Sequence, residues 1–68
     1  MSDHVYKIIE VVGTSDVNVH EAVRNAIHRA SKTVHNLQWF EVEDIRGSIH
    51  NGEPHFQVAV RIGFRLDE

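Results

Sequence analysis

Cysteine is absent from the sequence, and this absence excludes a disulfide framework, a thiolate metal site and a thiol nucleophile. The chain also contains no run of about eighteen apolar residues, so we expect no membrane-spanning helix and no membrane partner. Its first residues lack the basic and then apolar pattern of a secretory signal peptide. We therefore expect a soluble protein in the cytoplasm.

Positive charge is also scarce in this chain. Lys and Arg number 7 against 10 Asp and Glu, which gives a net charge of −3 with histidine neutral. A mildly acidic chain lacks the basic surface that binds a phosphate backbone, and this argues against a nucleic-acid partner. Hydrophobic residues make up 41% of the sequence, which is typical of a globular fold and argues against disorder.

The length of 68 residues fits one domain, and no linker, repeat or low-complexity segment divides residues 1–68. Apolar burial and the ordering of the chain each amount to on the order of 100 kcal/mol at this size, so the two terms nearly cancel. Since no disulfide can supply the missing stability, we expect the chain to gain it by self-association.

The first predicted element is a strand from His4 to Val12, because β-branched and aromatic residues dominate this stretch. Both of its faces carry apolar residues, as in a strand that is covered on two sides. The following Gly13-Thr14-Ser15 sequence is expected to end the strand.

The next segment has the period of an α-helix. Asn18 and Glu21 form a capping box at its start, and Asn36 is a suitable stop signal. The predicted apolar stripe consists of Val19, Ala22, Val23, Ala26, Ile27, Ala30 and Val34, and the predicted solvated positions are His20, Arg24, His28 and Lys32.

Two further strands are predicted after the helix. The first runs from Leu37 to His50, and a β-bulge near Glu43-Asp44 would restore its broken alternation. A turn over residues 51–54 makes the pair a hairpin. The last strand alternates without a break from Phe56 to Leu66.

This order predicts an α+β fold of β-α-β-β topology, in which a three-stranded antiparallel sheet packs on one helix. The helix covers one face of the sheet, so the other face meets water or another copy of the chain. Trp39 has the opposite parity to Phe40 and Val42, which places it on the face away from the helix. The one tryptophan is thus predicted outside the core.

Templates for catalysis are missing or weak. The chain has no phosphate-binding glycine loop and no nucleophile elbow. Glu41, Glu43 and Asp44 are of types used in acid-base catalysis, but a solvated strand face is the better explanation for them. We expect no enzyme activity.

The 6 histidines raise the question of a metal site. His28 and His35 lie seven positions apart, roughly 10 Å along a helix, which is too far for one ion. His50 and His55 flank the hairpin turn, where a third ligand is missing. We expect no metal centre.

Trp39 carries the most functional information. A lone tryptophan often packs in a core or interface, but an exposed indole is also the group that stacks on a flat heterocycle. Gln38 adjoins it in sequence, and Gln57 offers a donor and an acceptor for the amide edge of a flavin or a pyrimidine. Arg46 and Arg65 are suited to a phosphate, although each could also be an ordinary surface cation.

The chain resembles the dodecin family over nearly its whole length. The matching stretches, in order, are Val12-Gly13-Thr14-Ser15, the helix pattern from Glu21-Ala22 to Thr33, Trp39-Phe40-Glu41-Val42, Ile45-Arg46-Gly47, Phe56-Gln57-Val58 and Gly63-Phe64-Arg65-Leu66.

This resemblance implies a hollow homododecamer that stores, buffers and photoprotects flavin without turning over a substrate. It assigns Trp39 to flavin stacking and Gln57 to hydrogen bonding with the flavin ring. Arg46 and Arg65 match basic positions that favour FMN over riboflavin, with FAD as a further possibility. Coenzyme A is a second ligand that the resemblance suggests, with phosphate contacts from Lys7, Arg29 and Lys32.

Two other classes of function stay open. Trp39 can stack on another planar ligand such as a nucleobase, although the net charge of −3 argues against a nucleic-acid binder. The chain can also be a purely structural assembly module in which Trp39 fills a contact between subunits.

Overall fold

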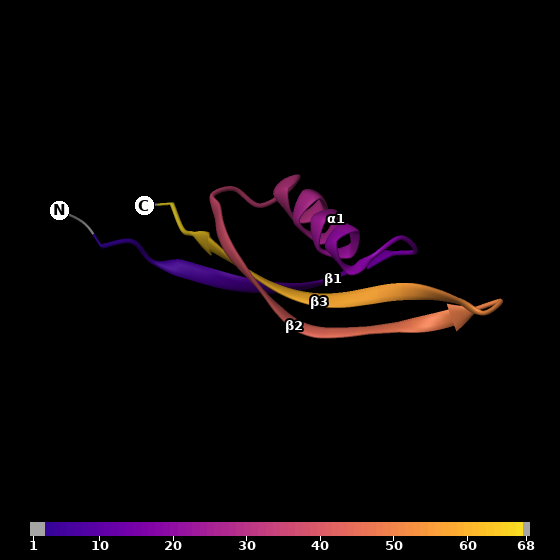
Figure 1. Ribbon diagram of the computed structural model, residues 1–68. Helices are drawn as coiled ribbons and strands as arrows, with labels where there is room; N and C mark the ends of the chain where they lie inside the picture. The colour runs from indigo at the N-terminus through magenta and orange to yellow at the C-terminus, as the bar shows by residue number, and fades with distance from the viewer. Residues whose placement is uncertain (1–2, 68) are drawn as a thin grey trace.

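The computed structural model describes residues 3–67 and has the predicted β-α-β-β order. Strand β1 (Tyr6–Ser15) leads to helix α1 (Val19–Ser31), which is followed by strands β2 (Leu37–His50) and β3 (Glu53–Arg65). Both strand pairings are antiparallel, and the strand order is β1-β3-β2. The last strand of the chain is therefore the centre of the sheet, and α1 covers one face of it (Figure 1).

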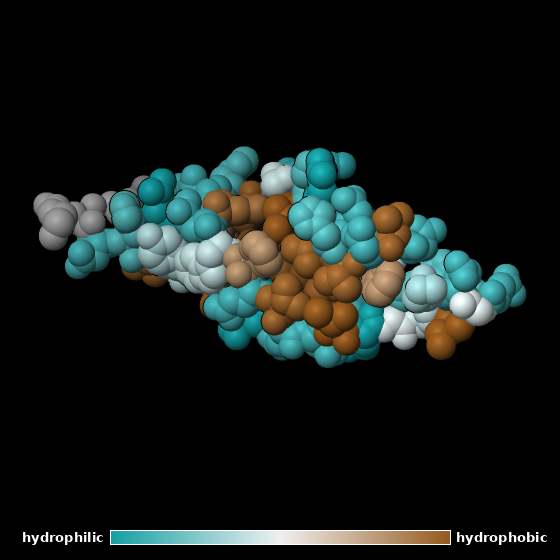
Figure 2. Space-filling model, viewed as in Figure 1, coloured by the Kyte–Doolittle hydropathy of each residue, from teal (hydrophilic) through white to brown (hydrophobic). Residues whose placement is uncertain are grey.

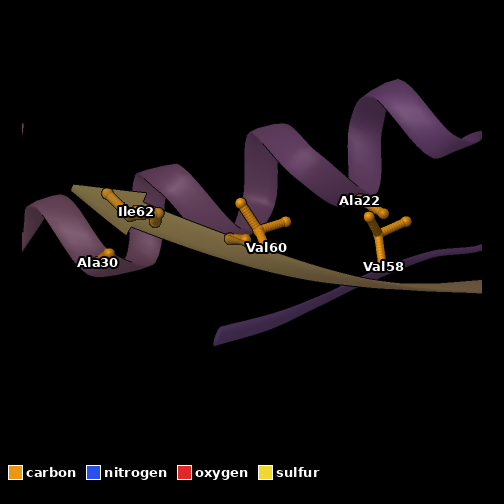
Figure 3. Close-up of a cluster of buried hydrophobic side chains, with 6 residues drawn as sticks. Ala22, Ala30, Val58, Val60 and Ile62 are labelled. Atoms are coloured by element: carbon orange, nitrogen blue, oxygen red, sulfur yellow. The ribbon is translucent and has the colours of Figure 1, made fainter. Parts of the chain in front are cut away.

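The core is a thin layer between α1 and β3. Small residues on the helix allow it to lie close to the sheet, and Figure 3 shows Ala22 of α1 next to Val58 of β3. The buried hydrophobic residues are Ala22, Ala26, Ala30, Val58, Val60 and Ile62. Six small or medium side chains form a modest core, which agrees with the marginal stability expected from the length.

Both ends of the first strand differ from the prediction. It begins at Tyr6 rather than His4, and it continues through Gly13, Thr14 and Ser15. These last three residues pair with β3 opposite residues 58, 57 and 56, so tertiary pairing outweighs their local preference for a turn. The outer face of this strand is also less covered than its composition predicted, because Ile8 and Val12 are exposed.

The start of the helix agrees with the prediction and its end does not. The Asn18 Oδ1 accepts a hydrogen bond from the Glu21 backbone N–H at 2.7 Å. The helix ends at Ser31, whose hydroxyl donates to the His28 carbonyl. Asn36 instead takes a positive φ of 65° in the connection to β2. Val34 and His35 thus lie beyond the helix, and the predicted helical spacing of His28 and His35 is wrong.

The hairpin follows the prediction closely. Strand β2 has the predicted bounds, and its register with β3 shifts between Val42 and Asp44, where the bulge was expected. The turn is shorter than predicted because β3 already begins at Glu53. Asn51 and Gly52 alone make the turn, both with positive φ, as a two-residue hairpin connection requires.

The molecule is elongated, with extents of 56 × 20 × 13 Å. In Figure 1 the tip of the β2-β3 hairpin extends well beyond α1. The accessible surface is 5059 Å², compared with roughly 4,400 Å² for a compact chain of this mass. No helix within residues 3–67 is long and apolar enough to cross a membrane.

Candidate functional site

Trp39 lies on the sheet face that α1 leaves open. It is paired with Gly63, the neighbour of the helix-facing Ile62, and side chains alternate between the two faces of a strand. The indole retains 38% of its accessible surface and is not part of the core cluster. The prediction that the single tryptophan lies outside the core is confirmed.

An aromatic neighbour supports the indole from another strand. The rings of Tyr6 and Trp39 meet edge to face, with centroids 5.3 Å apart and planes at 65°. Tyr6 belongs to β1 and Trp39 to β2, with β3 between them. Tyr6 could not be predicted as a neighbour of Trp39 from the sequence, because this contact depends on the strand order.

Gln38 and Arg65 lie near the same end of the sheet as Trp39. The Gln38 side chain donates to the Asn36 carbonyl at 3.3 Å. Arg65 pairs with Tyr6 in the register, and its backbone N–H donates to the Asn36 carbonyl at 3.0 Å. The structure therefore brings Gln38, Arg65 and Trp39 together at one end of the sheet.

Arg46 and Gln57 form a second group on the same face of the sheet. They are paired across β2 and β3, and the Arg46 Nε donates to the Gln57 Oε1 at 3.5 Å. The Arg46 Nη1 also forms an ion pair with the Asp44 Oδ2 at 3.0 Å. Arg46 thus donates to the acceptor atom of Gln57 and is itself paired with Asp44. Neither contact was predicted from the sequence.

The two groups are far apart within one chain. Gly63, which marks the position of Trp39 on β3, lies six residues from Gln57, or about 20 Å at the usual rise per strand residue. Arg65 lies eight residues from Gln57, or about 26 Å. A single chain therefore places Trp39 and Gln57 about 20 Å apart along the sheet, too far apart for both side chains to contact one flavin ring.

Acidic residues occupy the sheet between the two groups. Arg61 lies opposite both Glu10 and Glu41, and its guanidinium is 3.5 Å from Glu43 and 4.0 Å from Glu41. A side-chain hydrogen bond with Glu10, together with partial desolvation and repulsion from Glu10, raises the pKa of Glu43 above its ordinary value, against the opposing effect of Arg61.

The described residues contain no group of three or more side chains arranged to hold a metal ion.

Lys7, Arg29 and Lys32 are all exposed and lie on β1 and at the end of α1. Arg29 lines a hollow of about 640 Å³ between α1 and β1, together with Ile9, Val11 and Thr33. At the hairpin, the rings of His50 and His55 are in contact, with centroids 4.6 Å apart.

The chain is thus a small α+β protein, with a three-stranded sheet covered by one helix and an exposed indole and a separate glutamine-arginine pair on the open face. The family model named Dodecin matches residues 5–67, so the chain belongs to the dodecin family, whose members are multimeric.

Relatives and solved structures agree with this assignment. A dodecin of Thermus thermophilus is 48% identical over 65 residues, which are 94% of either chain. The dodecin of Streptomyces davaonensis is 51% identical with a TM-score of 0.95, covering 98% of this chain and 100% of that one. The dodecin of Streptomyces coelicolor is 54% identical with a TM-score of 0.94, covering 100% of this chain and 99% of that one.

Proposed function

We propose that the protein binds FMN in an assembly of twelve copies, stacks the flavin ring on Trp39 and stores it in a light-protected form. The observation that carries this proposal is the position of the indole, which is exposed on a flat sheet face and supported from beneath and from one edge. An aromatic ring presented in this way can stack on a planar heterocycle without rearranging the fold.

The distance between Trp39 and the Arg46-Gln57 pair indicates how such a site is built. Because Trp39 and Gln57 of one chain lie about 20 Å apart along β3, they serve different ligands. We infer that each flavin stacks on Trp39 of one copy and receives the Gln57 amide and the Arg46 guanidinium from another. This arrangement accounts for the need for an assembly in a protein that binds a small molecule.

The surface of the chain supports self-association. Phe40, Val42 and Ile45 of β2 are 49%, 42% and 55% exposed, and they pair with buried residues of β3 on the helix side of the sheet. Figure 2 shows apolar surface gathered at the centre of the molecule beside the helix. A hollow of about 350 Å³ between α1 and Phe40 continues this surface. Another copy of the chain is the occupant that the family assignment favours.

The proposed role involves no turnover of substrate. An indole stacked on an excited flavin donates an electron to it, and the return of that electron restores both partners without forming or breaking a bond. Light energy is thereby lost before side reactions occur, while FMN remains bound and available for release.

We assign Arg46 and Arg65 to the phosphate group of the ligand. Arg46 and Arg65 favour FMN over riboflavin because only FMN carries a phosphate anion. Coenzyme A is a second candidate ligand, favoured by the cationic rim that Arg29 gives to the hollow between α1 and β1. Lys7 and Lys32 are further candidates for its phosphates.

Fluorescence titration of FMN against the wild type and Trp39→Ala tests this function. We expect Trp39→Ala to keep the fold and the assembly, because the indole lies outside the core, and to weaken FMN by at least about tenfold through lost stacking and buried area. Flavin that still binds should fluoresce more strongly.

Trp39→Phe is the matched variant, since it keeps a stacking ring that donates electrons less readily. Its affinity should lie between those of the wild type and Trp39→Ala. Undiminished affinity and quenching in Trp39→Ala would exclude Trp39 from the site. Loss of the assembly in size-exclusion chromatography would instead favour the purely structural role.

A further inference from the structure

The indole of Trp39 lies directly against the backbone of Gly63. A Cβ atom added to Gly63 would overlap with the Cζ2, Cε2 and Cη2 atoms of the indole. Neighbouring strands are about 4.8 Å apart, so Tyr6 on β1 and Trp39 on β2 are separated by two strand spacings. Their rings reach each other because the central strand has no side chain at Gly63.

Backbone conformation does not explain glycine at this position. The φ of Gly52 is +77°, whereas the φ of Gly63 lies outside the left-handed region that favours glycine. Glycine in the interior of a strand also weakens the strand, and it often marks a close approach of another group. The space that Trp39 occupies is therefore the physical reason for glycine at position 63.

We propose that Gly63 and Tyr6 are positioning residues that set the depth and tilt of the Trp39 indole, and so the width of the slot for the planar ligand. Gly63 lets the indole lie low on the sheet, and Tyr6 limits its movement toward β1. This inference rests on the proposed flavin function for its ligand, but the position of the indole is measurable without any ligand.

Gly63→Ala tests the depth of the indole. The added methyl group must lift the ring away from the sheet into the space of the ligand, because Tyr6 blocks its edge. We expect the affinity for FMN to fall by about tenfold or more, since overpacking of a closely fitted site is unfavourable. The near-ultraviolet circular dichroism of the ligand-free protein should change as well, because Trp39 is the sole tryptophan.

Ala59→Ser is the matched control for this substitution. Ala59 lies on the same strand and the same face as Gly63, opposite Val12 and Asp44 and away from the indole. A serine there adds one heavy atom to the sheet surface without touching Trp39. Its tryptophan dichroism should equal that of the wild type, because the added hydroxyl lies away from the indole.

Two variants of Tyr6 test the edge contact independently. Tyr6→Ala removes the ring that limits the indole, so the tryptophan dichroism should weaken, whereas Tyr6→Phe keeps the ring edge and should retain the signal. Combining Tyr6→Ala with Gly63→Ala gives the lifted indole room to move aside, and we expect it to recover part of the FMN affinity lost in Gly63→Ala. If Gly63→Ala does not fold, the comparison of the two Tyr6 variants decides the question.

The proposal is overturned if Gly63→Ala folds with wild-type FMN affinity and unchanged tryptophan dichroism. It is also overturned if Tyr6→Ala and Tyr6→Phe give the same dichroism. Failure of the wild type to bind any flavin would contradict the proposed function alone, because the dichroism of the ligand-free variants still reports the position of the indole.

Discussion

The guanidinium of Arg46 has two partners within the chain, Asp44 and Gln57. Its guanidinium contacts the Asp44 carboxylate at 3.0 Å and the Gln57 amide oxygen at 3.5 Å, and its side chain is 61% exposed. A phosphate that approaches this group therefore competes with Asp44 for the same donors. The contact to Gln57 orders the amide that we assign to the flavin ring.

Removal of this arginine should distinguish the two flavins. A hydrogen bond to a charged group contributes about 1.5–3 kcal/mol, so we expect Arg46→Ala to weaken FMN about 10- to 150-fold relative to riboflavin. Parallel titrations with both ligands measure this ratio, with Arg65→Ala as a second variant. Equal losses for FMN and riboflavin would mean that Arg46 acts through the ring or through assembly.

Only part of the arrangement around Trp39 could be predicted from the sequence. The outward position of Trp39 follows from alternation, which requires only that Phe40 and Val42 face the helix. The support of the indole by Tyr6 and Gly63 depends on β3 lying between β1 and β2, and no local pattern encodes that order. A glycine within an otherwise regular strand was the one available signal.

At the scale of elements, β2 and β3 were the most predictable parts of the fold. Strict alternation and an Asn-Gly turn specify a hairpin locally, and the bulge was visible as a change of parity. The ends of β1 and α1 were less predictable because distant contacts determine them. Pairing with β3 extends β1 to Ser15, and the connection to β2 ends α1 at Ser31.

Glu43 makes the stability of the sheet depend on pH. The pKa of Glu43 is raised above its ordinary value of 4.5, with the hydrogen bond to Glu10 as the largest cause. The folded chain therefore binds this proton more tightly than the unfolded chain, and stability falls as the pH rises from 4.5 through the raised pKa. At neutral pH the destabilising effect is fully present.

Glu43→Gln should therefore raise the melting temperature at pH 7, and this gain should shrink as the pH falls toward 4.5. Thermal unfolding of both proteins across this range measures the effect, and Glu53→Gln at the far end of the hairpin is the charge-matched control. A lower melting temperature for Glu43→Gln at pH 7 would show that its ion pair with Arg61 outweighs the repulsion.

At the scale of the whole molecule, an elongated chain with a thin core leaves apolar surface uncovered. The same elongation separates Trp39 from Gln57, so the flavin site that we propose requires association. The length of the sequence indicated the need for association, whereas the proposal that the site is divided between copies rests on the register of β2 and β3.

Mixed assemblies test this division most directly. Chains carrying Trp39→Ala and chains carrying Gln57→Ala, each with a different affinity tag, are expressed together and purified through both tags, and light scattering verifies that their mass equals that of the wild-type assembly. We predict that assemblies of either variant alone quench FMN poorly, whereas the mixed assemblies recover part of the wild-type binding because some sites combine two intact residues from different chains. Mixed assemblies that bind no more FMN than either variant alone would contradict the account.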